Sequence, residues 1–195
     1  MPPDTALLTL GYDEHPQTMS VSSRAYHVVR QAIIQMHYEP GSLLSEAEIA
    51  RQLGISRQPV REAIIRLGLD GLVDVRPQRG TFVRLISVRE VENARFIREA
   101  IEVAIVRRCA TLATGEHIAG LEAAINDQRT AAAQGDHAGF LRCDEEFHQL
   151  IAAAAGCQDT WRVLQGLKAQ MDRVRYLSMP DATPPAVIID QHSRI

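Results

Sequence analysis

An acidic residue and a histidine, Asp144 and His148, lie four positions apart in the segment FLRCDEEFHQLI. Residues at this spacing share one face of a helix, so the carboxylate and the imidazole can meet. Apolar neighbours indicate that this face points into a helical core, where an unpaired polar group is costly. His192 lies in a similar apolar setting near the end of the chain. One carboxylate and two imidazoles would suit a divalent transition metal.

The spacing of these residues leaves two interpretations open. The first is a metal site made by Asp144, His148 and His192. The second is an ordinary hydrogen bond between Asp144 and His148 within one helix, with His192 as an unrelated surface residue. Spacing by itself favours the second interpretation, because it needs nothing beyond one helix.

A second group of residues could contact DNA. The apolar positions of the segment SRQPVREAIIRL repeat at the i, i+3, i+4, i+7 spacing of a helix that faces a core: Val60, Ala63, Ile64 and Leu67. Arg57, Gln58 and Arg61 fall on the opposite side. Arginine can bond guanine O6 and N7 together, while Ser56 with the first-turn N–H groups suits a phosphate.

The segment around these residues is expected to form two helices joined by a tight turn. Ser45 and Glu48 form a capping box that begins the first helix. Gly54 suits the tight turn that ends it. Ser56 then caps the second helix. This order is typical of a helix-turn-helix, in which the second helix enters the major groove.

A hairpin is expected after Gly71, where the apolar period changes to two. Two short strands would flank residues 77–80, which include Arg79 and Gly80. Such a wing with a basic tip is placed to reach the DNA backbone or minor groove. The alternative is an ordinary surface hairpin on a small helical domain.

The distribution of charge supports the DNA interpretation, although the net charge of the chain is −3. Residues 19–85 hold nine arginines against six acidic residues, whereas the rest of the chain holds twelve basic and eighteen acidic residues. The basic surplus therefore lies in the candidate DNA-binding segment.

Other bounds on the whole chain fit a cytoplasmic protein. Hydrophobic residues make up 46%, and no apolar run approaches the length of a membrane span. Residues 1–18 carry no secretory signal and are expected to form a flexible tail. The three cysteines show no paired spacing, so a disulfide framework or a zinc ribbon is not expected.

The region beyond Leu85 shows no strand pattern and is expected to form an antiparallel helical bundle. Its helices are expected at 88–112, 116–134, 136–155 and 159–177, with a last helix after the proline-rich loop 179–185. The predicted fold is therefore mainly α, with domains at 19–85 and 86–195. Because the last amphipathic segment stops at Ile195 without a cap, the second domain is expected to be truncated.

The first domain resembles the winged-helix domain of the GntR family of bacterial transcription regulators, on the residues PGSLLSEAEIARQLGISRQPVREAIIRLGLDGLVDVRPQRGTFV. The resemblance covers residues 22–85. It implies DNA contact by six residues: Ser56, Arg57, Gln58, Arg61, Arg79 and Gly80. Ala47 departs from the pattern, since many members carry arginine there, and the operator preference is expected to differ.

The helical region is similar to the FCD effector-binding domain of the FadR-like branch of that family. The resemblance matches Asp144, His148 and His192 to a metal site that could hold zinc, nickel or manganese. Many members add one more histidine, which would lie beyond Ile195, so the site is incomplete in this chain.

An arginine on the first FCD helix commonly faces the cavity, and the resemblance points to Arg98, beside Arg95 and Glu102. A guanidinium near a metal would clamp a small carboxylate metabolite. The alternative is an ordinary exposed pair between Arg98 and Glu102.

The expected function is a ligand-responsive transcriptional regulator and not an enzyme. The resemblance favours a homodimeric repressor that binds a palindromic double-stranded DNA operator and is released by a small organic acid. One alternative is a metal-dependent enzyme domain fused to a DNA-binding module, because an open metal position could activate water. A ligand-independent DNA binder is the other.

Overall fold

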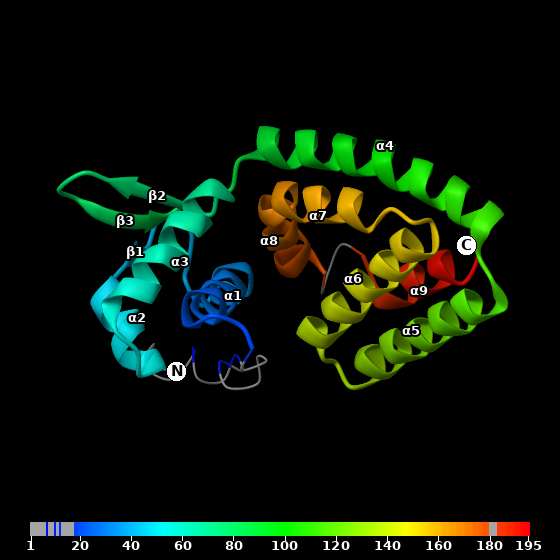
Figure 1. Ribbon diagram of the computed structural model, residues 1–195, viewed down its shortest axis with the longest axis horizontal. Coiled ribbons are helices and arrows are strands. Elements are labelled where there is room, and N and C mark those ends of the chain that lie inside the picture. The colour runs from blue at the N-terminus through cyan, green and yellow to red at the C-terminus, as the bar shows by residue number, and fades with distance from the viewer. Residues whose placement is uncertain (1–6, 8–9, 11, 13–17, 180–182) are drawn as a thin grey trace. The chain divides into compact units, whose positions relative to one another are not determined.

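The computed structural model describes residues 7, 10, 12, 18–179 and 183–195 (Figure 1). The chain divides into two compact units, Met1–Ser87 and Val88–Ile195. The predicted flexible tail falls largely outside the described residues. Within it, Leu7 and Tyr12 are buried, and the guanidinium of Arg24 lies 4.7 Å from the ring centroid of Tyr12. The mainly α fold predicted from the sequence is confirmed.

The first unit is a winged helix. Its elements in chain order are α1 (Val21–Ile34), β1 (Leu43–Leu44), α2 (Glu46–Leu53), α3 (Arg57–Leu69), β2 (Val73–Arg76) and β3 (Gly80–Val83). The Ser45 side chain accepts a hydrogen bond from the backbone N–H of Glu48 and so caps α2. Gly54 ends α2 in the left-handed conformation, with φ of 64°. The predicted helix-turn-helix is thus confirmed.

The core of this unit lies where α3 packs against α1. All four residues that the periodicity assigns to the inner face of α3 are buried: Val60, Ala63, Ile64 and Leu67. Their burial removes apolar surface from water and fixes the opposite face of α3 outward.

The wing belongs to a three-stranded antiparallel sheet in the order β1-β3-β2. The sequence predicts only β2 and β3, because β1 is two residues long and carries no visible period. Gly80 opens β3 with φ of +104°, and a Cβ there would lie 2.8 Å from Leu43 Cδ1. The hairpin geometry therefore requires glycine at this position.

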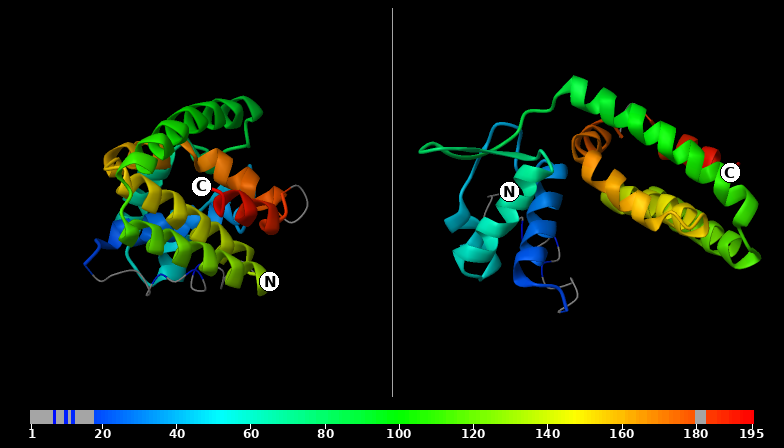
Figure 2. Two further views of the ribbon diagram at one scale, coloured as in Figure 1. Left: turned by 90° about the vertical axis from the view of Figure 1, so that its right-hand side faces the viewer. Right: turned by 45° about the horizontal axis from the view of Figure 1, so that its top comes forward.

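The second unit is a helical bundle (Figure 2). Its elements are α4 (Val88–Leu112), α5 (Gly115–Ala133), α6 (His137–Ala154), α7 (Gln158–Leu167), α8 (Ala169–Ser178) and α9 (Pro185–His192). Helices α5 and α6 lie side by side, and α4 and α7 also pack on α6. Phe147, Ile151 and Trp161 lie in the core between these helices.

One predicted element is wrong. The sequence predicts a single helix over 159–177, whereas the structure has α7 and α8 with a break at Lys168 (Figure 1). The Lys168 ammonium forms ion pairs with Glu145 of α6 and Asp172 of α8. The break therefore carries a buried cation whose partner Glu145 lies on another helix, which local periodicity does not report.

No helix within the described residues combines the length and apolar character needed to cross a bilayer.

Candidate functional site

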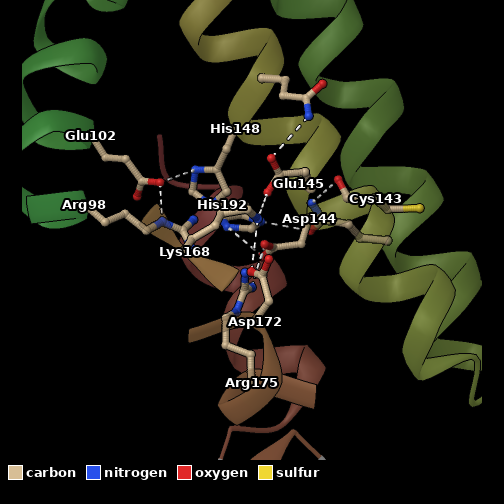
Figure 3. Close-up of polar contacts among 12 residues, drawn as sticks. Arg98, Glu102, Cys143, Asp144, Glu145, His148, Lys168, Asp172, Arg175 and His192 are labelled. Carbon is tan, nitrogen blue, oxygen red and sulfur yellow. Dashed lines mark hydrogen bonds and ion pairs between the residues drawn. The ribbon is translucent and has the colours of Figure 1, made fainter. Parts of the chain in front are cut away.

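Two helices bring the predicted metal ligands together. Asp144 and His148 project from α6, and His192 comes from the end of α9 (Figure 3). One ligand atom from each residue lies within 4.8 Å of the other two. The Asp144 carboxylate is 1% exposed, and His192 is 7% exposed. His192 is therefore not the unrelated surface residue of the second interpretation.

A buried amide fixes the orientation of the His192 ring. Gln128 of α5 is fully buried, and its Nε2 donates to the backbone carbonyl of Cys143 at 3.4 Å. Its Oε1 is then the acceptor for His192 Nδ1, which lies 2.9 Å away. Neutral His192 thus carries its proton on Nδ1 and its lone pair on Nε2. Nε2 lies 3.8 Å from Asp144 Oδ1, on the side where an ion would bind.

Aromatic rings hold both imidazoles in place. Phe147 stacks on His192, with ring centroids 4.3 Å apart, and Trp161 stacks on His148 at 5.9 Å. The two imidazole rings are nearly perpendicular, with centroids 5.2 Å apart. These contacts restrict the rings to orientations in which both border the Asp144 carboxylate.

The burial of the site sets its protonation states. Burial lowers the pKa of His148 to about 3 and also lowers the pKa of His192, although Asp144 partly opposes both shifts. Burial alone would raise the pKa of Asp144, but Arg175 and His148 hold this pKa below its ordinary value. At neutral pH the site is an ionised carboxylate with two neutral imidazoles, the states that metal binding requires.

The donor set fits a divalent transition metal. Ligand atoms around one ion at about 2.1 Å lie roughly 3–4 Å apart. The 3.8 Å from Asp144 Oδ1 to His192 Nε2 falls in this range. The remaining separations, within 4.8 Å, need only a small contraction. Asp144, His148 and His192 could therefore hold such an ion through one oxygen and two nitrogens.

Arg175 of α8 completes the site and was not predicted from the sequence. Its Nη2 lies 2.6 Å from Asp144 Oδ2, so the guanidinium occupies one carboxylate oxygen and leaves Oδ1 toward His192. Arg175 lies on a helix whose predicted bounds were wrong, and no local pattern connects it to Asp144.

The predicted effector residues divide into two groups. Arg98 donates through Nε to Glu102, and both side chains are largely buried on α4. The carboxylate of Glu102 lies 3.9 Å from His148 Nδ1, and burial raises the pKa of Glu102 despite the nearby Arg98. Arg98 and Glu102 thus border the metal ligands (Figure 3) and are not an exposed pair. Arg95 is exposed, and the structure does not bring it to this site.

Glu145 follows Asp144 on α6 but contacts a different set of residues. Its sequence context predicts a solvated side chain, and this is wrong. Glu145 accepts hydrogen bonds from Trp161 at 3.0 Å and from Gln165 at 3.3 Å, and it pairs with Lys168. The contacts of Glu145 therefore connect α6 to α7 and to the break before α8.

The predicted DNA-contacting residues are exposed in the first unit. Arg57, Gln58 and Arg61 lie on the outer side of α3. Ser56 occupies the N-cap, and its side chain makes no capping hydrogen bond. The hydroxyl and the first-turn N–H groups are thus arranged to suit a phosphate.

The wing tip is also exposed. Arg79 and Gly80 lie at the turn between β2 and β3, a hairpin that projects from this unit (Figure 1). The backbone N–H of Arg79 donates to the carbonyl of Arg76 at 3.0 Å, which closes the turn. The guanidinium of Arg76 packs over Phe82. Arg79 therefore lies in the turn itself, while Arg76 packs against β3.

Known proteins share both units. Residues 21–83 match the family described as "Bacterial regulatory proteins, gntR family", and residues 94–195 match the "FCD domain". The "HTH-type transcriptional repressor RspR" of Escherichia coli (strain K12) is 41% identical over 175 residues, which cover 90% of this chain and 77% of that protein.

Solved structures agree with the match. The structure titled "E. coli McbR/YncC" has a TM-score of 0.76 at 21% identity, covering 90% of this chain and 82% of that one. A "putative transcriptional regulator GntR" from Rhodococcus sp. RHA1 has a TM-score of 0.71 at 26% identity, covering 90% and 84%. The relative RspR and the Rhodococcus structure are both named as transcription regulators. The chain therefore belongs to the GntR family of bacterial transcriptional regulators and carries an FCD domain.

Proposed function

We propose that this protein is a homodimeric repressor in the bacterial cytoplasm, released from DNA by a small carboxylate metabolite bound beside the Asp144, His148 and His192 cluster. One observation carries the proposal. Two guanidinium groups, Arg98 from α4 and Arg175 from α8, approach the cluster from different helices. Two cations beside an open metal position match an organic acid more closely than a neutral ligand.

The chemistry of the ligand follows from these groups. A divalent ion held by the cluster supplies an electrophilic position for one carboxylate oxygen. Arg98 can then donate to the other oxygen or to a second acidic group. Arg175 keeps its ion pair with Asp144. Its other N–H groups remain able to attract the negative charge of the ligand.

The link to DNA binding runs through α4. This helix begins at Val88, directly after the winged-helix unit, and carries Arg98 and Glu102 two to four turns later. A ligand that binds Arg98 therefore contacts the same helix that is covalently joined to the DNA-binding unit. Differential binding of the ligand to two placements of α4 would shift operator affinity.

The DNA side of the proposal rests on the exposed groups of α3 and the wing. Arg57, Gln58 and Arg61 would read base edges, while Ser56 and the wing-tip residues Arg79 and Gly80 would contact backbone or minor groove. A homodimer would place two such surfaces on a palindromic operator. The relative RspR is itself described as a repressor.

The first test is metal content. The purified chain is expected to bind Zn²⁺, Ni²⁺ or Mn²⁺ in equilibrium dialysis with elemental analysis, because a buried carboxylate and two imidazoles with lowered pKa lie within reach of one ion. The double variant Asp144→Ala, His148→Ala is expected to retain no metal. Unaltered metal content in a folded double variant would refute the metal assignment.

The second test is thermal stability with the metal present and a panel of mono-, di- and tricarboxylates. A carboxylate at 100 times its Kd is expected to add about 2.7 kcal/mol of stability. Arg98→Gln should remove the response, whereas Arg95→Gln, on the exposed side of the same helix, should keep it. No response to any carboxylate would favour a ligand-independent DNA binder.

A further inference from the structure

A groove lies on the surface of the second unit, between α6 and α7. Its volume is about 510 Å³, within the range of small-molecule sites. The apolar part of its wall is formed by Leu150, Ala153 and Trp161. The polar part of its wall includes Glu146, Gln149 and Gln165. None of these residues is a ligand in the candidate metal site, so the groove is a second place where a small molecule could bind.

Glu145 fixes the orientation of three side chains that line the groove. Its Oε1 accepts hydrogen bonds from Trp161 Nε1 at 3.0 Å, Gln149 Nε2 at 3.2 Å and Gln165 Nε2 at 3.3 Å. An ionised carboxylate can only accept, so each amide must direct its NH₂ group toward Glu145. The amide oxygens of Gln149 and Gln165 therefore remain as acceptors for a ligand in the groove.

The charge of the lining favours a cation. Arg162, at the edge of the groove, is paired with Asp159 at 2.9 Å. Glu146 is exposed at the groove and adds a negative charge beside the two amide oxygens. An ammonium group offers three donors and a positive charge to such a set of acceptors. The apolar wall suits a hydrocarbon body attached to that ammonium.

We propose that this groove binds a small organic amine. The ammonium lies at Glu146 and at the amide oxygens of Gln149 and Gln165, and the apolar body lies against Leu150 and Trp161. This ligand is opposite in charge to the carboxylate proposed for the metal cluster. The two sites would therefore take different compounds.

Trp161 contacts both sites. Its ring lines the groove and also stacks on His148, with ring centroids 5.9 Å apart. An amine in the groove would therefore touch a residue that holds a candidate metal ligand in place. Amine binding itself requires neither a metal in the cluster nor a second copy of the chain, so its test does not depend on the proposed function.

The test uses the emission of Trp161, which is the only tryptophan in the chain. Benzylamine, phenethylamine and hexylamine are titrated into the whole metal-free protein. A saturable change in emission is expected, because the apolar body of the amine lies against the indole. Hydrocinnamate and phenethyl alcohol, which resemble phenethylamine in size but are anionic and neutral, should bind more weakly.

Variants of the lining test the placement of the amine. Glu146→Gln is expected to raise the amine dissociation constant about two- to fivefold, the effect of removing one exposed ion pair. Glu116→Gln, the same change at an exposed position of α5, should leave the constant unchanged. Ala153→Phe fills the groove without changing its charge and should abolish the response. Circular dichroism checks that each variant retains its helices.

The outcomes decide both the groove and the class of ligand. A lack of saturable change with all three amines would overturn the proposal, and so would equal affinity for hydrocinnamate. Amine binding that neither Glu146→Gln nor Ala153→Phe alters in folded protein would also overturn it. Weaker binding in Glu146→Gln, with no change in Glu116→Gln, supports it. Because the protein is metal-free, the metal assignment and the carboxylate response stand or fall by their own tests.

Discussion

At the scale of single residues, the candidate site depends on a side chain that takes no part in metal ligation. Gln128 has both ends of its buried amide engaged, with Cys143 on one side and His192 on the other. Because a flipped amide would set its oxygen against the Cys143 carbonyl, the Gln128 oxygen faces His192 Nδ1 and leaves the Nε2 lone pair toward Asp144. Its role resembles that of the hydrogen-bonded carbonyls and carboxylates that orient metal-bound histidines elsewhere.

We expect Gln128→Leu to lower the metal affinity about 10- to 100-fold, since partners of ligating histidines contribute that much. Competition with a coloured chelator measures the affinity. Gln128→Glu keeps an acceptor opposite His192 Nδ1 but loses the donor to Cys143, so it should lower the metal affinity less than Gln128→Leu does. A folded Leu variant with wild-type affinity would show that His192 needs no such support.

The DNA-binding surface also leads to a residue-scale prediction. Arg61→Ala is expected to cost about 1–3 kcal/mol on the specific operator and to relax specificity there. Arg66→Ala is the matched control on the same helix, because the Arg66 guanidinium stacks 4.1 Å from the ring centroid of Tyr26. It should change stability more than operator affinity. Equal loss on specific and random DNA would show that Arg61 contacts only phosphate.

At the scale of elements, the break between α7 and α8 sets the different directions of these two helices. Lys168 occupies the break, and its ammonium is held by Glu145 from α6 and Asp172 from α8. The change in direction lets α8 bring Arg175 to Asp144 while α7 keeps Trp161 against His148. A single straight helix would place Trp161 and Arg175 too far apart for the first to contact His148 and the second to contact Asp144.

This ion pair predicts a pH dependence of stability. Burial alone would raise the pKa of Glu145, but Lys168 and hydrogen bonds lower it to about 2. A lowered folded pKa stabilises the protein above the unfolded value, near 4.5, and this stabilisation is lost as the pH falls toward 2. Its size at neutral pH is on the order of 3 kcal/mol.

Urea unfolding between pH 3 and pH 7 measures the effect. The wild type should exceed Glu145→Gln in unfolding free energy at pH 7, and the difference should shrink steadily below pH 4.5. Parallel curves for the two proteins over this range would show that the charge of Glu145 does not stabilise the fold.

At the scale of the whole molecule, the chain joins the GntR unit to the FCD unit at the start of α4. Each unit is compact by itself, and α4 is the covalent connection through which the proposed ligand would act on DNA binding. Coupling between two sites is reciprocal in free energy. Under the proposed function, the carboxylate and the operator would therefore weaken each other's binding by the same factor.

We expect a carboxylate identified by thermal shift to reduce operator affinity by about 5- to 150-fold, the usual range of such coupling. Saturating operator DNA should then reduce carboxylate affinity by an equal factor in calorimetric titrations. Fluorescence anisotropy with labelled operator provides the first number. Unequal factors would show that the ligand acts outside the equilibrium between bound and released regulator.

Much of the fold was predictable from sequence because its signals are local. The cap at Ser45, the left-handed turn at Gly54 and the periodicity of α3 each depend on a few neighbouring residues. The helices α5 and α6 were predicted to within one residue for the same reason. The strand β1 and the break at Lys168 were not predicted, since each is defined by contacts with distant segments.

The sequence by itself determined the family, the outward arginines of α3 and the pairing of Asp144 with His148 on one helix face. The family resemblance already assigned His192 and Arg98 to this site, but only the tertiary structure brought Gln128 from α5 and Arg175 from α8 to that face. The physical reason is that helical periodicity fixes the direction of a side chain around its own axis. The partner it meets depends on how the helices pack, which the pattern of one segment does not contain.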